Sequence, residues 1–125
     1  MNISQNSVCW FEIYVQVMER AKAFYEGVLS VKLEKLNSES PELWAFPGAP
    51  EKPGCCGALV KMPGKDSGCG GTIIYFSCED CANETSRVEG NGGKIIQNKF
   101  SIGEYGFIAL VEDTEGNMVG FHSLK

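Results

Sequence analysis

One order of expected secondary-structure elements occurs twice in the sequence, and this repeat limits the possible folds more than any other feature. I-Y-V at residues 13–15 corresponds to I-Y-F at 74–76, and G-A-L-V at 57–60 corresponds to G-N-M-V at 116–119. The two spacings, 74 − 13 = 61 and 116 − 57 = 59 residues, are nearly equal. A half this short cannot bury a sheet face alone, so we expect two modules that fold together.

Hydrophobic periodicity gives the same elements in each half. Residues 8–15 are rich in β-branched and aromatic side chains, which indicates a strand, and from Val17 apolar residues recur at helical spacing. The further elements expected are strands at 31–36, 43–46 and 57–62, then a strand at 72–77, a helix at 79–89, and strands at 94–97, 106–111 and 117–122.

These elements predict an α+β fold of two βαβββ modules that form a curved, eight-stranded mixed sheet. We expect a single domain over residues 1–125, with one module at about 8–62, a linker at 63–70 and a second module at about 71–123. The stretch D-T-E-G-N at 113–117 is expected to be a hairpin turn with Gly116 or Asn117 at positive φ. The loop at 101–106 holds two glycines and could cover a site.

Composition excludes several classes of partner. The formal net charge is −5, and the 11 Lys and Arg residues are scattered, whereas a nucleic-acid surface needs a dense basic face. The first residues lack the basic and apolar regions of a signal peptide, and no apolar run approaches the ~18 residues of a membrane span. We therefore expect no nucleic-acid partner, no membrane and a cytoplasmic location.

The chain has six cysteines, which we expect to be thiols packed as small apolar groups, because a disulfide framework needs a secreted context. C-E-D-C at 78–81 has the spacing of half a zinc or redox site. Strand alternation turns Cys78 toward the helices, and Cys81 falls in the first helical turn. A zinc module would need a second, similarly spaced pair, so zinc and redox roles stay lesser alternatives.

Longer motifs resemble a known family. W-F-E-I-Y-V-Q-V-M-E-R-A-K-A-F-Y at 10–25, N-G-G-K-I-I at 91–96 and E-D-T-E-G-N-M-V-G-F at 112–121 are similar to the vicinal oxygen chelate superfamily, and the resemblance covers about residues 8–123. That superfamily includes glyoxalase I, bleomycin-resistance proteins and extradiol dioxygenases. The resemblance implies the fold, but one scaffold can host many sites.

The resemblance also implies where a metal would bind. Metalloenzymes of the family hold a divalent ion with four side chains, from the first and last strands of both modules. Counted from the motifs, these positions are Trp10, Ile73 and Gly120, and internal symmetry gives Lys61 to within one residue. None of the four is a usual metal ligand, and an ammonium would repel a cation. We therefore expect no metal and no cofactor.

Strand alternation then supplies a candidate site, because residues two apart share a face. The residues expected to bind a ligand in this cup are Trp10, Glu12, Tyr14, Lys61, Ile73, Tyr75, Gly120 and His122, with Leu59 beside Lys61. A few polar groups on an aromatic wall are typical of a small-molecule site. Glu12 and His122 form the catalytic hypothesis, as an acid–base pair.

Simpler roles for these residues remain open. The aromatic residues could fill a core, Glu12 and Lys61 could form a structural ion pair, and His122 could be exposed or singly hydrogen-bonded.

Two classes of function follow. One is a binding module that holds a small organic molecule without metal, as resistance-type members do. The other is a glyoxalase-like lyase or isomerase, related to lactoylglutathione lyase, that uses Glu12, Lys61 or His122 without metal or with an atypical metal site. The resemblance also implies a homodimer, since a second chain often completes the cup in such folds.

Overall fold

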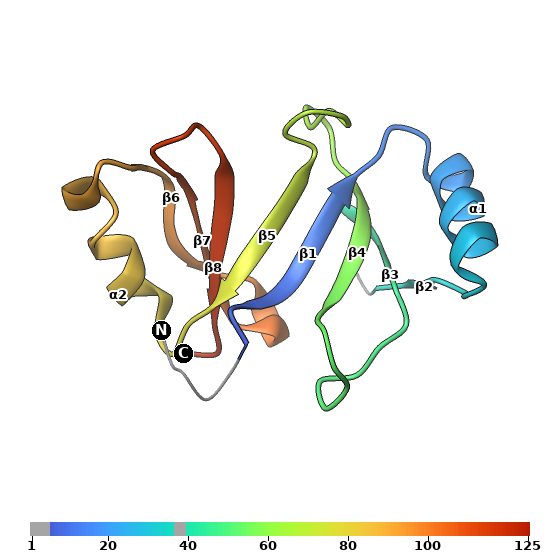
Figure 1. Cartoon of the computed structure of the whole chain (residues 1–125), viewed down its shortest axis with the longest axis horizontal. Coiled ribbons are helices and arrows are strands. Elements are labelled where there is room, and N and C mark those ends of the chain that lie inside the picture. Colours follow the sequence, from blue (N-terminus) through green and yellow to red (C-terminus); the bar gives the residue numbers. More distant parts are fainter. Residues whose placement is uncertain (1–5, 37–39) are drawn as a thin grey trace. The chain divides into compact units, whose positions relative to one another are not determined.

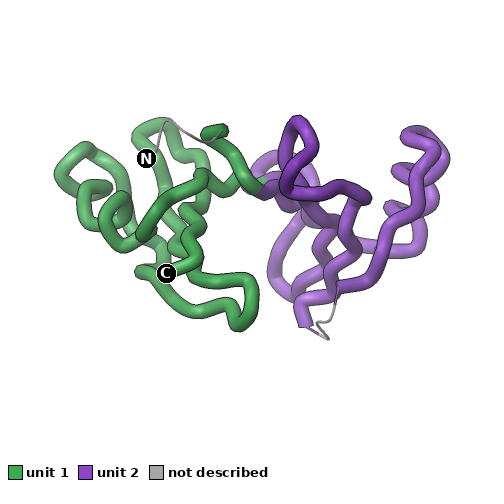
Figure 2. The backbone as a smooth tube through the Cα atoms, turned by 90° about the horizontal axis from the view of Figure 1, so that it is seen from below, with its two compact units in different colours: residues 1–9, 73–125 green, residues 10–72 purple. Residues whose placement is uncertain are grey.

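The computed structural model describes residues 6–36 and 40–125, and the chain forms two compact units (Figure 2). Unit 2 comprises residues 10–72, and unit 1 comprises residues 73–125 together with the start of the chain through Cys9. The first strand, β1, therefore begins in unit 1 and continues in unit 2 from Trp10.

Unit 2 contains one helix and four strands in the order β2-β3-β4-β1 (Figure 1). The first and last strands, β1 and β4, are parallel neighbours, whereas β3 is antiparallel to both β2 and β4. The elements are β1 (Val8–Tyr14), α1 (Met18–Leu29), β2 (Glu34–Lys35), β3 (Glu42–Ala45) and β4 (Cys56–Lys61).

Unit 1 follows the same plan, with strands in the order β5-β8-β7-β6 (Figure 1). Its first and last strands, β5 and β8, are again parallel, and β7 is antiparallel to β6 and β8. The elements are β5 (Thr72–Ser77), α2 (Cys81–Ser86), η1 (Glu89–Asn91), β6 (Lys94–Ser101), η2 (Gly103–Tyr105), β7 (Phe107–Glu112) and β8 (Met118–Ser123), where η marks a short 3-10 helix.

The order strand, helix, three strands occurs twice, which confirms the predicted α+β fold of two βαβββ modules. Three elements differ in length from the prediction. Strand β2 has two residues instead of six, because Leu33 turns into the core and its N–H donates to Glu26 Oε2 at 2.9 Å. Helix α2 is short, since Thr85 and Ser86 hydroxyls donate to backbone carbonyls of their own turn. Strand β6 continues beyond residue 97 to Ser101.

One face of the unit 2 sheet packs against α1 and holds the core of this unit. Val15, Met18, Leu33 and Leu59 are buried there, and Leu59 is completely inaccessible to solvent. The residues packed around this cluster are Ile13, Ala21, Tyr25, Trp44 and Phe46. Burial of these side chains removes apolar surface from water and holds the helix on the sheet.

In unit 1, α2 packs against β6, β7 and β8. Asp80 caps this helix, as its side chain accepts a hydrogen bond from the Ala82 N–H at 3.0 Å and also meets Lys99 Nζ at 2.9 Å. The N–H group of Cys81, one residue before Ala82, donates to the buried Ser123 Oγ of β8 at 3.0 Å. These bonds tie the start of the helix to the last strand.

The turn between β7 and β8 has the expected geometry. Asp113 accepts hydrogen bonds from the N–H groups of Glu115 and Asn117 at 2.8 and 2.9 Å. Gly116 has φ of 85°, which confirms the prediction of positive φ. The hydrogen bonds from Asn117 and Glu115 hold the pKa of Asp113 below its ordinary value. The turn sets the register in which β8 returns beside β7.

The completely buried Leu59 gives a direct test of this packing. We expect Leu59→Ala to lower the free energy of unfolding by about 2–5 kcal/mol, because the cavity it leaves cannot close fully. Leu124→Ala is the matched control, since Leu124 is 79% exposed and should change stability by less than about 0.5 kcal/mol. Urea unfolding of both variants measures the difference, and equal stability losses would contradict the assigned core.

Candidate functional site

The face of unit 2 that points away from α1 carries a cluster of three side chains from β1. Glu12 accepts hydrogen bonds from Trp10 Nε1 at 3.2 Å and from the Tyr14 hydroxyl at 2.9 Å. Burial and the neighbouring Glu12 carboxylate strongly raise the pKa of Tyr14, so its hydroxyl stays protonated and donates. The carboxylate is thus held between two aromatic donors, and we call this group the Glu12 cluster.

The pairing of β1 with β4 decides which further residues share this face. Glu12 lies opposite Ala58 and Tyr14 opposite Val60, both in parallel register. Ala58 and Val60 are buried. The wall beside the Glu12 cluster is therefore apolar, with no charge contributed by β4.

Lys61 does not lie where the sequence placed it. It pairs with Glu42, and strand alternation puts it on the α1 face with Leu59. Val60 lies at the expected position. It pairs with Tyr14 in unit 2, just as its counterpart Gly120 pairs with Tyr75 in unit 1. Val60 is one residue from Lys61 and lies within the one-residue tolerance of the count by internal symmetry. Glu12 and Lys61 leave the sheet on opposite faces, which argues against the structural ion pair.

In unit 1, the face that points away from α2 brings together Ile73, Tyr75, Gly120 and His122. Tyr75 lies opposite Gly120 and Ser77 opposite His122 in the parallel pairing of β5 with β8. The Tyr75 ring covers Gly120 closely, since a Cβ atom at Gly120 would lie 2.3 Å from ring carbon Cδ1. Ile73 and Tyr75 are both buried. A glycine is required at position 120 because the Tyr75 ring occupies the space that any side chain there would need.

His122 is held by the loop at 101–106. Its Nε2 lies 2.6 Å from the carbonyl oxygen of Tyr105, the last residue of η2. Its other neighbour is the thiol of Cys9 from the start of β1. The hydrogen bond with Cys9 raises the pKa of His122 and outweighs the opposing effect of burial, with help from the Tyr105 carbonyl.

Cys9 is the residue that sequence reasoning missed, because it was taken for an apolar filler. Its Sγ also contacts the Tyr75 carbonyl oxygen at 3.7 Å. A cysteine in the first strand and a single histidine in the last strand were the available signal, but strand alternation would set Cys9 on the face opposite to Trp10 and Glu12. The pairing that joins them could not be derived from spacing.

The predicted catalytic residues fall in different units, with Glu12 in unit 2 and His122 in unit 1. Glu12 contacts Trp10 and Tyr14, and His122 contacts Tyr105, so each has neighbours within its own unit. The acid–base pair stays a prediction.

The residues at the four family positions do not fit a divalent ion. With the corrected register they are Trp10, Val60, Ile73 and Gly120, which offer no carboxylate and no imidazole. The Tyr75 ring fills the space in which a side chain from position 120 would begin. Within residues 6–36 and 40–125, no group of three or more His, Cys, Asp or Glu residues is placed to hold a metal.

The C-E-D-C pair is turned away from the strand face of unit 1. Cys78 and Cys81 are both buried thiols, and Cys81 begins α2. Burial, together with the nearby Glu84, raises the pKa of Cys78 to about 12, which disfavours the thiolate form that reacts.

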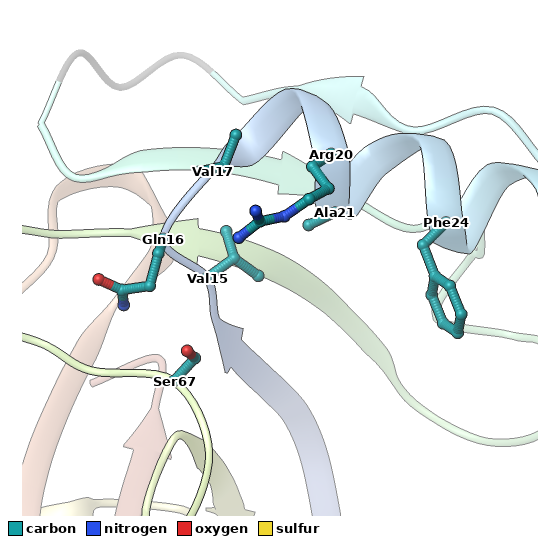
Figure 3. A pocket seen from close by; sticks show the side chains of 7 residues that line it. All are labelled: Val15, Gln16, Val17, Arg20, Ala21, Phe24 and Ser67. Carbon is teal, nitrogen blue, oxygen red and sulfur yellow. The ribbon is translucent and has the colours of Figure 1, made fainter.

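Two surface grooves occur in unit 2, on the side of α1. One, of about 330 Å³, lies at the start of α1, where the Arg20 side chain reaches toward Val15 and Gln16 (Figure 3). The other, of about 380 Å³, is apolar and includes Phe11, Tyr25 and Phe46. Neither groove is lined by a predicted site residue.

Comparison with known proteins agrees with the architecture. The sequence pattern of the Glyoxalase/Bleomycin resistance protein/Dioxygenase superfamily matches residues 7–121. The chain belongs to this superfamily. No curated protein sequence matches it. None of the helices in the described part of the chain is long and apolar enough to cross a membrane.

Similar solved structures show the same fold at low sequence identity. A hypothetical protein from Bacillus halodurans has a TM-score of 0.68 at 18% identity, covering 94% of each chain. Methylmalonyl-CoA epimerase from Mycobacterium tuberculosis has a TM-score of 0.68 at 12% identity, over 95% of this chain and 88% of that one. A Streptomyces coelicolor methylmalonyl-CoA epimerase in complex with 2-nitronate-propionyl-CoA has a TM-score of 0.67 at 13% identity, over 93% and 92%.

The close contact at Gly120 predicts a cost for any side chain there. We expect Gly120→Ala to lower the free energy of unfolding by about 1–3 kcal/mol, because the buried Tyr75 ring must move. Gly27→Ala in α1 is the control, since nothing lies within 4 Å of its new Cβ and alanine favours the helix by up to about 1 kcal/mol. Thermal unfolding distinguishes the two, and a Gly120→Ala protein as stable as wild type would contradict this packing.

Proposed function

We propose that the chain binds a small organic molecule on the strand face of the Glu12 cluster, without a divalent ion at the four family positions. The observation that carries this proposal is the Glu12 carboxylate, fixed by the Trp10 indole and the Tyr14 hydroxyl on an otherwise apolar wall. Convergent polar atoms on an aromatic surface are the usual composition of a small-molecule site.

The same geometry defines the chemistry of the ligand. A carboxylate only accepts hydrogen bonds when ionised, so the ligand should present a donor such as an amine, amide or hydroxyl group. Trp10 and Tyr14 offer aromatic surface, which suits a planar apolar body joined to that donor. The family resemblance adds the expectation of a homodimer.

A second candidate is glyoxalase-like lyase or isomerase chemistry by proton transfer. It is favoured by the pKa of His122, which its hydrogen bond with Cys9 raises above the ordinary value, so that the ring holds a proton to higher pH than a free imidazole. In this candidate Glu12 would accept a proton. The test is whether the wild type converts an aldehyde–thiol conjugate to product. Conversion that is lost in both Glu12→Gln and His122→Gln would favour the enzyme over the binding module.

A thermal-shift screen against small amines, acids, aldehydes, thiol conjugates and aromatic antibiotics tests the binding proposal. We expect the compound that most raises the midpoint temperature of unfolding to contain a hydrogen-bond donor. This compound should not raise the midpoint of Glu12→Gln, in which the side chain keeps its shape but has no carboxylate. Each variant is compared with its own midpoint without compound.

Glu42→Gln is the matched control. Trp44 Nε1 donates to Glu42 Oε2 at 2.9 Å, so the same Trp–Glu contact exists in unit 2 on the α1 face. The shift should persist in Glu42→Gln. A shift that survives Glu12→Gln, or that falls equally in both variants, would refute binding at the Glu12 cluster.

A further inference from the structure

The groove of about 330 Å³ at the start of α1 combines a cationic side chain with an apolar wall. A concave site of this size can hold a small organic molecule. The groove lies within unit 2, between the start of the helix and the loop that joins β4 to β5. Its apolar part includes Val15, Ala21 and Phe24, and its polar part consists of Gln16, Arg20 and Ser67.

Arg20 brings the positive charge of the groove. Figure 3 shows its guanidinium directed back toward Gln16. Among the described residues, the carboxylate next to it in the sequence, that of Glu19, meets Lys22 Nζ at 3.7 Å instead. Asp66, in the loop before β5, is exposed and does not line the groove. The planar fork of N–H donors that an arginine presents fits the two oxygens of a carboxylate.

Hydrogen bonds hold the loop that carries Ser67 beside the start of the helix. Gln16 Nε2 donates to the Lys65 carbonyl oxygen at 3.1 Å, and the Tyr14 N–H donates to the Gly71 carbonyl oxygen at 2.7 Å. These bonds fix the loop on both sides of Ser67 in the sequence. Gln16 Nε2 has a second hydrogen, and a serine hydroxyl can also donate. The polar part of the groove therefore offers hydrogen-bond donors from three side chains.

The apolar part of the groove is open to water. Phe24 is 59% exposed and Val17 is 46% exposed, whereas Met18 of the same segment is buried in the core. The Phe24 ring meets the Tyr25 ring edge-on, with 5.0 Å between the ring centroids, which supports its position. A ligand that covers these side chains would remove apolar surface from water.

We propose that this groove binds a small carboxylate that carries an apolar group, with the carboxylate on Arg20 and the apolar group against Phe24. The site goes beyond the proposed function, because it lies on the α1 side of unit 2 and takes an anion, whereas the Glu12 carboxylate favours a hydrogen-bond donor. The formal net charge of −5 opposes general attraction of anions, so the affinity has to come from these local contacts.

Titration of the isotope-labelled protein with benzoate, followed by NMR chemical shifts, tests the site. We expect saturable shifts that include the side-chain amide of Gln16 and the backbone N–H of Ser67. Arg20→Gln should raise the dissociation constant by about tenfold, because it removes charge-assisted hydrogen bonds. Benzyl alcohol, which has the ring without the charge, and acetate, which has the charge without the ring, should both bind the wild type more weakly than benzoate.

Arg87→Gln is the matched control. Arg87 is the other arginine of the chain, lies in unit 1 and meets Glu84 at 3.9 Å, so its substitution changes the net charge equally without touching the groove. Both Arg87→Gln and Glu12→Gln should bind benzoate as the wild type does. Arg20 and Phe24 are exposed, so their variants should keep the fold, which the midpoint temperature of unfolding checks.

Phe24→Ala tests the apolar contact, and it should weaken the binding of benzoate but not that of acetate. An affinity for benzoate that is unchanged in Arg20→Gln, or that falls equally in Arg87→Gln, would overturn the proposal. Benzyl alcohol binding as tightly as benzoate would also overturn it. A dimer that is lost in Phe24→Ala, in a protein that binds no benzoate, would show that a second copy covers the groove and would refute the carboxylate site.

Discussion

Parallel pairing of the first and last strands in each unit is the constraint on which the remaining structure depends. In unit 2 it sets Tyr14 beside Val60, and in unit 1 it sets Tyr75 beside Gly120. Because side chains alternate along a strand, a slip of one residue would exchange the core face for the open face. The register therefore decides both which residues pack under the helices and which residues can meet a ligand.

The two open faces have different chemistry even though the modules share one plan. In unit 2 a carboxylate is held by an indole and a phenol, which favours recognition of a hydrogen-bond donor. In unit 1 an imidazole is hydrogen-bonded to a backbone carbonyl beside a tyrosine ring that covers a glycine. The Tyr75 ring over Gly120 occupies space that a ligating side chain would need.

The sequence predicted the fold well because the evidence for it is local. Alternating apolar residues, the helical spacing after Val17 and the glycine turn at Gly116 each specify an element without knowledge of its neighbours. The sequence predicted the Glu12 cluster for the same reason, since three residues of one strand at spacing two must share a face. Lys61 was misplaced because its position depended on pairing between distant strands. Cys9 was overlooked because its contact with His122 joins residues more than a hundred positions apart.

We propose that the strand faces act through their own side chains at positions where metalloenzymes of the superfamily hold an ion. Metal content is its most direct test, measured by mass spectrometry on protein purified without chelator and then incubated with manganese, nickel or zinc and desalted. The account predicts far less than one ion per chain, with no difference between wild type and Glu12→Gln. One tightly bound ion per chain in the wild type that is lost in Glu12→Gln would contradict it.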